Sequence, residues 1–129
     1  MTLLQKAKDV REKAYAPYSK FKVGAALRTQ SGNEYTGCNV ENVAYPQGLC
    51  AEAGAIAAMI SNGDETIVEI AVVADTEEPV SICGGCRQKL SEFAAPDTPV
   101  TMSTMNGKEH QTTLGDLIPG VFQKKDLPK

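Results

Sequence analysis

The stretch IVEIAVVAD, residues 67–75, decides the fold because it is an almost unbroken apolar run of strand length. Such a run is typical of a strand buried on both faces, which occurs where helices cover both sides of a sheet. The alanine-rich segment before it, from Cys50 to Asn62-Gly63, is predicted to be a helix that ends at the Asn-Gly pair. The segment after it, ICGGCRQKLSEF, is predicted to turn at residues 83–86 and open another helix. We therefore expect the buried strand to lie between two cysteine-bearing helices.

Working outward from this strand, the sequence predicts one α/β domain over residues 1–129. At the N-terminus, Thr2 and Gln5 form a T-x-x-Q capping box that precedes apolar residues at helical spacing. The predicted elements are a helix over 2–15, strands over 21–29 and 34–40, the helix from 50, the strand 67–75, the helix from 83, a hairpin around Asn106-Gly107 and a short C-terminal helix. This order favours a three-layer αβα sandwich around a mixed sheet of about five strands.

The composition narrows the class of partner. The 129-residue chain carries a formal net charge of −3, so no overall attraction to nucleic acid or to anionic membranes is expected. No apolar stretch approaches the roughly 18 residues of a membrane span, and the first residues lack the apolar segment of a secretion signal. We expect a cytoplasmic protein whose four cysteines are metal ligands, catalytic groups or free thiols rather than disulfides.

Three of the cysteines are spaced as ligands of one metal ion. Cys83 and Cys86 form a C-x-x-C pair on a turn that enters a helix, and Cys50 opens the other helix. Three thiolates at two adjacent helix N-termini can bind one zinc ion and leave a fourth position open, which is the layout of a catalytic zinc site. Glu52 is then expected to stand beside the open position as a proton carrier rather than as a ligand.

Three other interpretations of the cysteines are open at this point. A structural zinc site could add Cys38, which lies in a strand-like segment without the usual tight ligand spacing. A redox dithiol at Cys83 and Cys86 leaves Cys50 and Glu52 without a role. Inert, buried cysteines do not explain the Gly-Gly pair inside the C-x-x-C segment.

Two longer segments carry a resemblance to a known family. GCNVENVAYPQGLCAE (37–52) and CGGCRQKLSEF (83–93) resemble the zinc-dependent cytidine deaminases of the small homotetrameric type. AYAPYSKFKVGAAL (14–27) and LIPGVF (117–122) are similar to the same family, so the resemblance covers nearly the whole chain. It implies hydrolytic deamination of cytidine and deoxycytidine to uridine and deoxyuridine with release of ammonia, in pyrimidine salvage. The nearest enzymatic alternative is a deaminase of a cytosine-containing antibiotic, of the blasticidin type.

The resemblance also implies a role for each matching residue. Zinc is the implied cofactor, a free nucleoside is the implied substrate, and a homotetramer is the implied assembly. The implied roles are zinc binding for Cys50, Cys83 and Cys86, proton transfer for Glu52, ribose binding for Asn39 and Glu41, stacking near the base for Phe21, backbone contact to the base for Ala51, and cover of a neighbouring subunit's site for Phe122.

The chain departs from the family pattern at two positions. Ile82 stands where the family usually has proline before the first cysteine of the C-x-x-C pair, and Ala53 stands where it often has arginine after the glutamate. Zinc with three thiolates has a formal charge of about −1, which a nearby cation can offset. With alanine at position 53, we expect Arg87, directly after Cys86, to bond a ligand sulfur and supply that charge.

Overall fold

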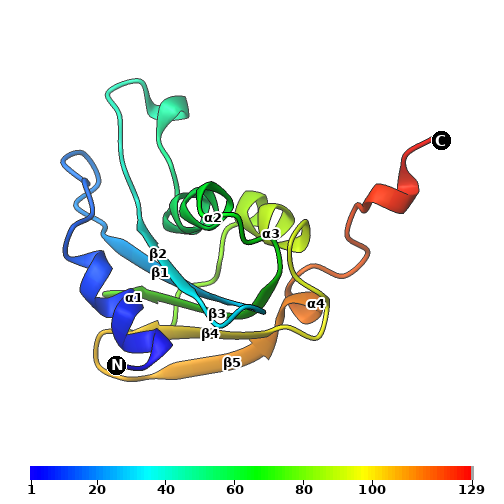
Figure 1. The fold of residues 1–129 in the computed structure, drawn as a ribbon. Helices are drawn as coiled ribbons and strands as arrows, with labels where there is room; N and C mark the ends of the chain where they lie inside the picture. The colour runs from blue at the N-terminus through cyan, green and yellow to red at the C-terminus, as the bar shows by residue number, and fades with distance from the viewer. Residues whose placement is uncertain (129) are drawn as a thin grey trace.

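The computed structural model describes residues 1–128 and contains one five-stranded mixed sheet (Figure 1). The strand order across the sheet is β2-β1-β3-β4-β5. β3 pairs in parallel with β4, whereas β1 with β2, β1 with β3 and β4 with β5 pair antiparallel. The strands are β1 (Val23–Thr29), β2 (Glu34–Cys38), β3 (Ile67–Ala74), β4 (Pro99–Thr104) and β5 (Glu109–Thr113). The predicted mixed sheet is confirmed.

Helices cover both faces of this sheet, as the apolar run 67–75 predicted (Figure 1). α1 (Leu3–Arg11) packs on one face, and α2 (Ala51–Ser61) and α3 (Gly84–Ser91) pack on the other. Residues 70–74 of β3 are all buried, because alternate side chains enter the two cores. The α1 core contains Leu3, Ala7, Ala26, Ala71 and Val73, and the α2–α3 core includes Ala55, Met59, Ile70, Val72 and Leu90.

The starts of α2 and α3 bring the cysteines to one edge of the layer. Cys50 is the N-cap of α2 and Cys83 is the N-cap of α3, both with extended backbone. α2 lies unusually close to β2 because Gly37 has no side chain, and a Cβ at this position would lie 2.3 Å from the backbone nitrogen of Ala55. The sheet thus fixes the position of the helix that begins at Cys50.

Some predicted boundaries differ from the structure. α1 has the predicted capping box of Thr2 and Gln5 but ends at Arg11 rather than at residue 15. The reason is tertiary pairing: the backbone N–H of Tyr15 donates to the carbonyl of Asn39 at 3.0 Å, so residues 15–16 no longer follow the helix. The remaining helix, α4 (Leu114–Leu117), is the predicted short C-terminal helix. No helix within residues 1–128 is long and apolar enough to cross a membrane.

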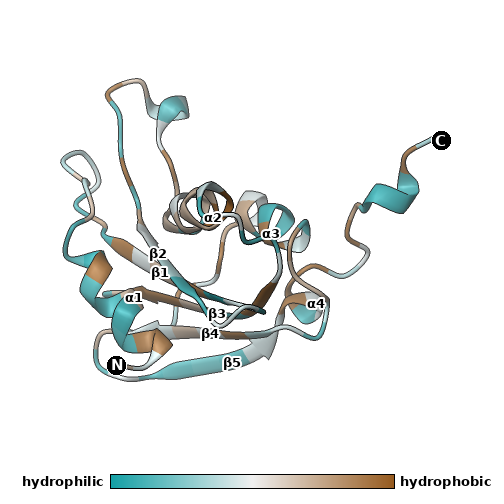
Figure 2. Cartoon of the chain, viewed as in Figure 1, coloured by the Kyte–Doolittle hydropathy of each residue, from teal (hydrophilic) through white to brown (hydrophobic). Residues whose placement is uncertain are grey.

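Two segments extend away from the layered body (Figure 1). One is the loop between β2 and α2, which contains the 3₁₀ turn η1 (Tyr45–Gln47), and the other follows α4 and contains η2 (Lys124–Asp126). Figure 2 shows apolar stretches along both segments. Val43 and Tyr45 on the loop are 77% and 75% exposed, and Phe122 on the C-terminal segment is 59% exposed. Apolar side chains of this size with so little cover are candidates for contact with another molecule.

Candidate active site

Three cysteine sulfurs meet where α2 and α3 begin. The Sγ atoms of Cys50, Cys83 and Cys86 all lie within 4.8 Å of one another, and those of Cys50 and Cys83 are 3.8 Å apart. Cys50 and Cys83 are exposed, whereas Cys86 is buried in the first turn of α3. Cys38 is also a free cysteine but does not belong to this cluster within the described residues. The structure therefore gives no support to a four-cysteine structural site.

The cluster has the chemistry and dimensions of a zinc site. Sulfurs about 2.3 Å from a tetrahedral zinc ion lie about 3.8 Å from each other, which is the separation of Cys50 and Cys83. Thiolate sulfur is a preferred zinc donor, and three donors leave one tetrahedral position for a small molecule. The partial positive charge of two helix N-termini also favours thiolates at this place.

The protonation of the three thiols depends on their surroundings. Burial, and then the nearby Cys83, raise the pKa of Cys50, while burial and the charge of Glu52 raise the pKa of Cys86. Burial also acts to raise the pKa of Cys83, but hydrogen bonds from the Cys86 backbone and from the other two thiols lower it overall. Burial and mutual repulsion thus oppose ionisation of two of these thiols, and a bound divalent cation is the group that would stabilise the three thiolates together.

Glu52 lies beside the cysteines in the first turn of α2 and is only 4% exposed. Burial raises the pKa of its carboxyl group above the ordinary value, against smaller opposing effects of its own backbone N–H and of Lys89. Among residues 1–128, no other residue donates a hydrogen bond to this carboxylate. A buried carboxyl group with a raised pKa is suited to accept and release protons in an acid–base reaction.

A cavity of about 490 Å³ joins these groups to the other residues that the sequence singled out. Cys50, Cys83 and Glu52 line one part of it. Its walls also include Phe21, Asn39, Glu41 and Ala51, together with Val72 from the central strand and Val80, Ser81, Tyr45 and Leu49. Phe21 is 39% exposed and precedes β1, so it is a wall of the cavity rather than a core residue of the strand. A volume of several hundred Å³ is typical of a small-molecule site.

Asn39 and Glu41 shape the wall of this cavity through their side chains. Asn39 accepts a hydrogen bond from the backbone N–H of Val23 at 2.9 Å and donates one to the carbonyl of Phe21 at 2.8 Å. Glu41 accepts hydrogen bonds from the backbone N–H groups of Tyr18 and Ser19. Both side chains therefore hold the segment that carries Phe21, in addition to facing the cavity.

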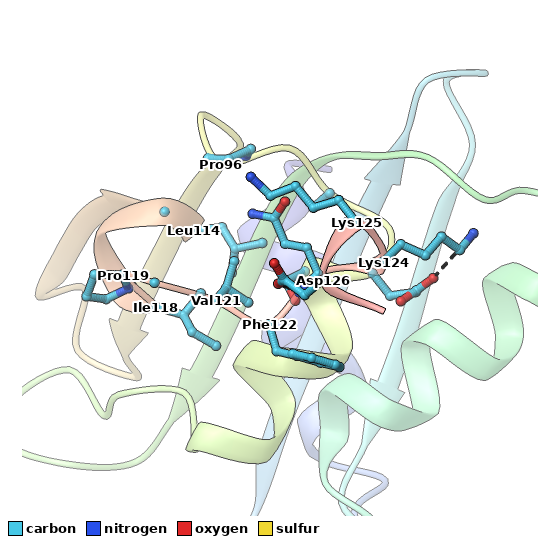
Figure 3. Close-up of a pocket in the computed structure, with 15 residues that line it drawn as sticks. Pro96, Leu114, Ile118, Pro119, Val121, Phe122, Lys124, Lys125 and Asp126 are labelled. Atoms are coloured by element: carbon cyan, nitrogen blue, oxygen red, sulfur yellow. Dashed lines mark hydrogen bonds and ion pairs between the residues drawn. The ribbon is translucent and has the colours of Figure 1, made fainter. Parts of the chain in front are cut away.

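Phe122 does not reach this cavity in its own chain. Figure 3 shows it instead beside a cavity of about 840 Å³ beneath the C-terminal segment, where Lys124 and Glu92 form an ion pair at 3.9 Å. That cavity is larger but is lined by no cysteine or histidine among the described residues. We place the candidate active site in the smaller cavity because Cys50, Cys83 and Glu52 line it and the sulfur of the buried Cys86 lies within 4.8 Å of the other two.

The position of Arg87 differs from the expectation. Its guanidinium donates hydrogen bonds to the carbonyls of Ile82 and Leu117 and to the Ser81 hydroxyl, and none to a cysteine sulfur within residues 1–128. These acceptors lie on the loop before Cys83 and at the end of α4. The sequence did not indicate this role, because two of the acceptors are backbone carbonyls, which no residue type marks, and Leu117 is 30 positions away.

Residues from two loops, the β2–α2 loop and the β3–α3 loop, were missed as cavity walls. Tyr45, Leu49, Val80 and Ser81 line the cavity, but no spacing rule links them to the cysteines. The signal that the sequence did offer was composition, because Tyr45 and Leu49 are apolar residues in a loop without periodicity. In the folded chain both side chains are more than half exposed. Such residues are candidates for binding rather than for packing.

The fold and site define a class before any comparison: an α/β protein with a three-cysteine metal site beside a cavity that a buried glutamate lines. Residues 1–102 match the family described as the cytidine and deoxycytidylate deaminase zinc-binding region. The chain belongs to this zinc-binding deaminase family.

Individual relatives agree with the family match. The chain is 48% identical over 125 residues to a cytidine deaminase from Sporosarcina psychrophila, a match that covers 97% of this chain and 92% of the relative. A crystal structure of cytidine deaminase from Burkholderia pseudomallei has 45% identity and a TM-score of 0.90, and the match covers 95% of this chain and 100% of that one. A blasticidin-S deaminase from Bacillus cereus is 38% identical over 109 residues, with coverage of 78% and 76%.

Proposed function

We propose that this chain is a zinc-dependent enzyme that hydrolyses cytidine and deoxycytidine to uridine and deoxyuridine with release of ammonia, in pyrimidine salvage. The observation that carries the proposal is a cluster of three cysteines beside a cavity that a buried glutamate and two polar side chains also line. The cytidine deaminase from Sporosarcina psychrophila is more similar to the chain, with 48% identity over 97% of it, than the blasticidin-S deaminase, with 38% identity over 78%, which favours the nucleoside as substrate.

Cys50, Cys83 and Cys86 are the zinc ligands in this proposal, because their sulfurs have the mutual distances of a tetrahedral site. A zinc ion bound there supplies Lewis-acid activation of water. The chain's own contribution is to hold three thiolates at two helix starts, next to a cavity that admits a small substrate.

Glu52 is the proton carrier of the proposed reaction. It accepts a proton from the attacking water and delivers it to N3 of the cytosine ring, which keeps it. It then accepts the second proton from the new C4 hydroxyl and delivers it to the departing amino group, so that the C4–N bond breaks and ammonia leaves. Its burial supports this role, because a raised pKa brings the carboxyl group closer to the proton affinity of the groups with which it exchanges protons. No other described residue donates a hydrogen bond to this carboxylate, so it keeps acceptor sites for the substrate beyond the one that its own backbone N–H uses.

In this proposal, the sugar and base are held by other residues that line the same cavity. Asn39 and Glu41 each retain hydrogen-bonding capacity after their contacts to the chain, and both line the cavity, which supports contacts to ribose hydroxyls. Phe21 presents an aromatic surface for the base, and the backbone around Ala51 contacts the base edge at the start of α2. Binding energy from the sugar then positions C4 of the base for attack.

The proposed active form is a homotetramer in which Phe122 covers the site of a neighbouring subunit. The exposure of Phe122 and of the loop that carries Val43 and Tyr45 supports an apolar contact between copies (Figure 2). Residues 1–129 act as one catalytic domain, and the free thiol ligands suit the reducing cytoplasm. Light scattering tests the assembly, and an active monomer would contradict it.

A direct assay tests the proposed activity. Zinc per chain is measured in the purified protein, and the fall in cytidine absorbance is followed together with ammonia release. One zinc per chain with conversion of cytidine, and much slower conversion of free cytosine, is the expected result. A zinc-loaded protein that leaves cytidine unchanged, or that acts equally on free cytosine, would overturn the substrate assignment.

A further inference from the structure

We infer that Ser19 is a positioning residue for nucleoside binding: its hydroxyl holds the Glu41 carboxylate toward the sugar and links it to Phe21 on the base side. The inference rests on the proposed function, because it concerns the same cavity and the same substrate. Ser19 itself lies on an adjoining cavity of about 360 Å³ that shares Glu41 with the active-site cavity. It acts through Glu41 and is not placed in contact with the reacting atoms.

The contacts of Glu41 come from one short segment. Oε1 accepts hydrogen bonds from the backbone N–H of Tyr18 at 3.0 Å and of Ser19 at 3.1 Å. Oε2 accepts a hydrogen bond from the Ser19 hydroxyl. These donors, with the Ser19 hydroxyl first, hold the pKa of Glu41 below its ordinary value, so this side chain is an ionised acceptor at neutral pH.

The number of acceptor sites on Glu41 explains why the serine matters. A carboxylate oxygen offers about two acceptor sites, so the two backbone donors fill Oε1. The Ser19 hydroxyl takes one site of Oε2 and leaves one site for a further donor. Since Glu41 lines the active-site cavity, that remaining site suits a hydroxyl of the substrate sugar. Without Ser19, Oε2 would have no donor from the described chain to fix its direction.

Ser19 also contacts the base side of the cavity. Its hydroxyl oxygen accepts a hydrogen bond from the backbone N–H of Phe21 at 3.0 Å. Lys20, between them, has a left-handed backbone with φ of 61°, a conformation that costs energy outside glycine and folds the segment back on itself. One hydroxyl thus connects the carboxylate for the sugar with the backbone of the aromatic residue for the base.

A comparison of two substrates distinguishes the positioning of Glu41 for the sugar from a general structural role of Ser19 in its loop. The Ser19→Ala variant is assayed with cytidine and with 2′,3′-dideoxycytidine, which lacks the 2′- and 3′-hydroxyls of the sugar. We expect kcat/KM for cytidine to fall about tenfold, mainly through KM, because a hydrogen bond to a charged group is lost. For the dideoxy substrate we expect a change within about twofold, because Asn39 still holds the carbonyl of Phe21. Ser19→Thr retains the hydroxyl and is expected to recover most of the cytidine activity.

The controls make each outcome decisive. Ser91→Ala removes a hydroxyl that donates only to the Gln88 carbonyl of its own helix, and it is expected to leave both substrates unaffected. An equal loss on both substrates, no loss on cytidine, no recovery by threonine, or failure of Ser19→Ala to fold would each overturn the role of Ser19. If the wild-type zinc protein does not act on cytidine, the proposed function fails and this inference fails with it.

Discussion

The Sγ atoms of Cys50 and Cys83 lie 3.8 Å apart although 33 positions separate the two residues. Each is the N-cap of its helix, and the two helices pack side by side on one face of the sheet. The metal site is therefore made by tertiary packing, and a ligand that binds these thiols binds only the folded arrangement. Metal binding is consequently expected to stabilise the fold as well as to serve the reaction.

Serine in place of a cysteine ligand tests the metal site without disturbing the helix. Serine is a favourable N-cap residue, so Cys83→Ser should preserve α3 while removing a zinc donor. We expect this variant to lose bound zinc and activity, and we expect Cys38→Ser to retain one zinc per chain. Metal analysis of the two purified variants checks both statements. Loss of zinc from the Cys38 variant would instead indicate a structural zinc site with four cysteine ligands.

Glu52→Gln tests proton transfer at constant shape. Glutamine can occupy the same buried position and still accept a hydrogen bond, but it cannot carry a proton. We expect zinc content and thermal unfolding close to those of the wild type, with a fall in kcat of at least about 10²–10⁴-fold, the usual value of general acid–base catalysis. Steady-state kinetics on cytidine provide the measurement. A variant that keeps most of its kcat is incompatible with the role of Glu52.

The sequence predicted the features that neighbouring residues determine, but not those that depend on contacts between distant segments. The burial of β3 followed from a continuous apolar run, and the cysteine cluster followed from one tight pair and the preceding helix start. The end of α1 was predicted too late, because Tyr15 leaves the helix to pair with a residue on another segment. Local periodicity does not report such pairing.

Two polar interactions also could not be predicted from local patterns in the sequence. The guanidinium of Arg87 binds the carbonyl of Leu117, 30 positions away, and no pattern of residue types indicates a backbone acceptor. The Asp64 carboxylate gathers donors from the β1–β2 turn that the sequence order does not relate to it. In both cases the charged residue was visible in the sequence, but its partner was decided by the packing of loops.

Asp64 predicts a pH dependence of stability. Its carboxylate accepts hydrogen bonds from Tyr35 at 2.6 Å, Asn33 at 3.0 Å and two hydroxyl groups, which lower its pKa in the folded chain. A lowered folded pKa adds stability above the unfolded value of about 4, and this stability is lost as pH falls through the folded pKa. We expect Asp64→Asn to unfold at a lower temperature than wild type at pH 7, with a smaller difference near pH 3.

Thermal unfolding across this pH range checks the role of Asp64. Asp97→Asn is a matched control, because Asp97 is exposed and receives no hydrogen bond at its carboxylate from residues 1–128. That variant should follow the wild type at both pH values. If the deficit of Asp64→Asn stays constant from pH 7 to pH 3, the hydrogen bonds to the charged form are not its cause.

Substitutions of Arg87 test whether the metal site requires the hydrogen-bond geometry of this side chain or only its positive charge. Its guanidinium donates to the carbonyl of Ile82, the residue before Cys83, at 2.7 Å, and also to Ser81 and to Leu117. This arrangement fixes the loop that presents the Cys83 thiol and ties it to the end of α4. Lysine keeps the positive charge but has a single nitrogen, so it cannot bridge these acceptors as the planar guanidinium does.

We therefore expect Arg87→Lys to resemble Arg87→Ala, with zinc affinity or activity reduced about 10–100-fold in both, the usual scale for groups that orient metal ligands. Zinc competition with a chelator, together with kcat on cytidine at neutral pH, provides the measurement. Ala53→Arg in the Arg87→Ala background is the charge control, because it adds a cation in the first turn of α2 without restoring the bridge. If lysine at position 87 or arginine at position 53 recovers the zinc affinity, the positive charge rather than the bridge between Ile82 and Leu117 is what the site requires.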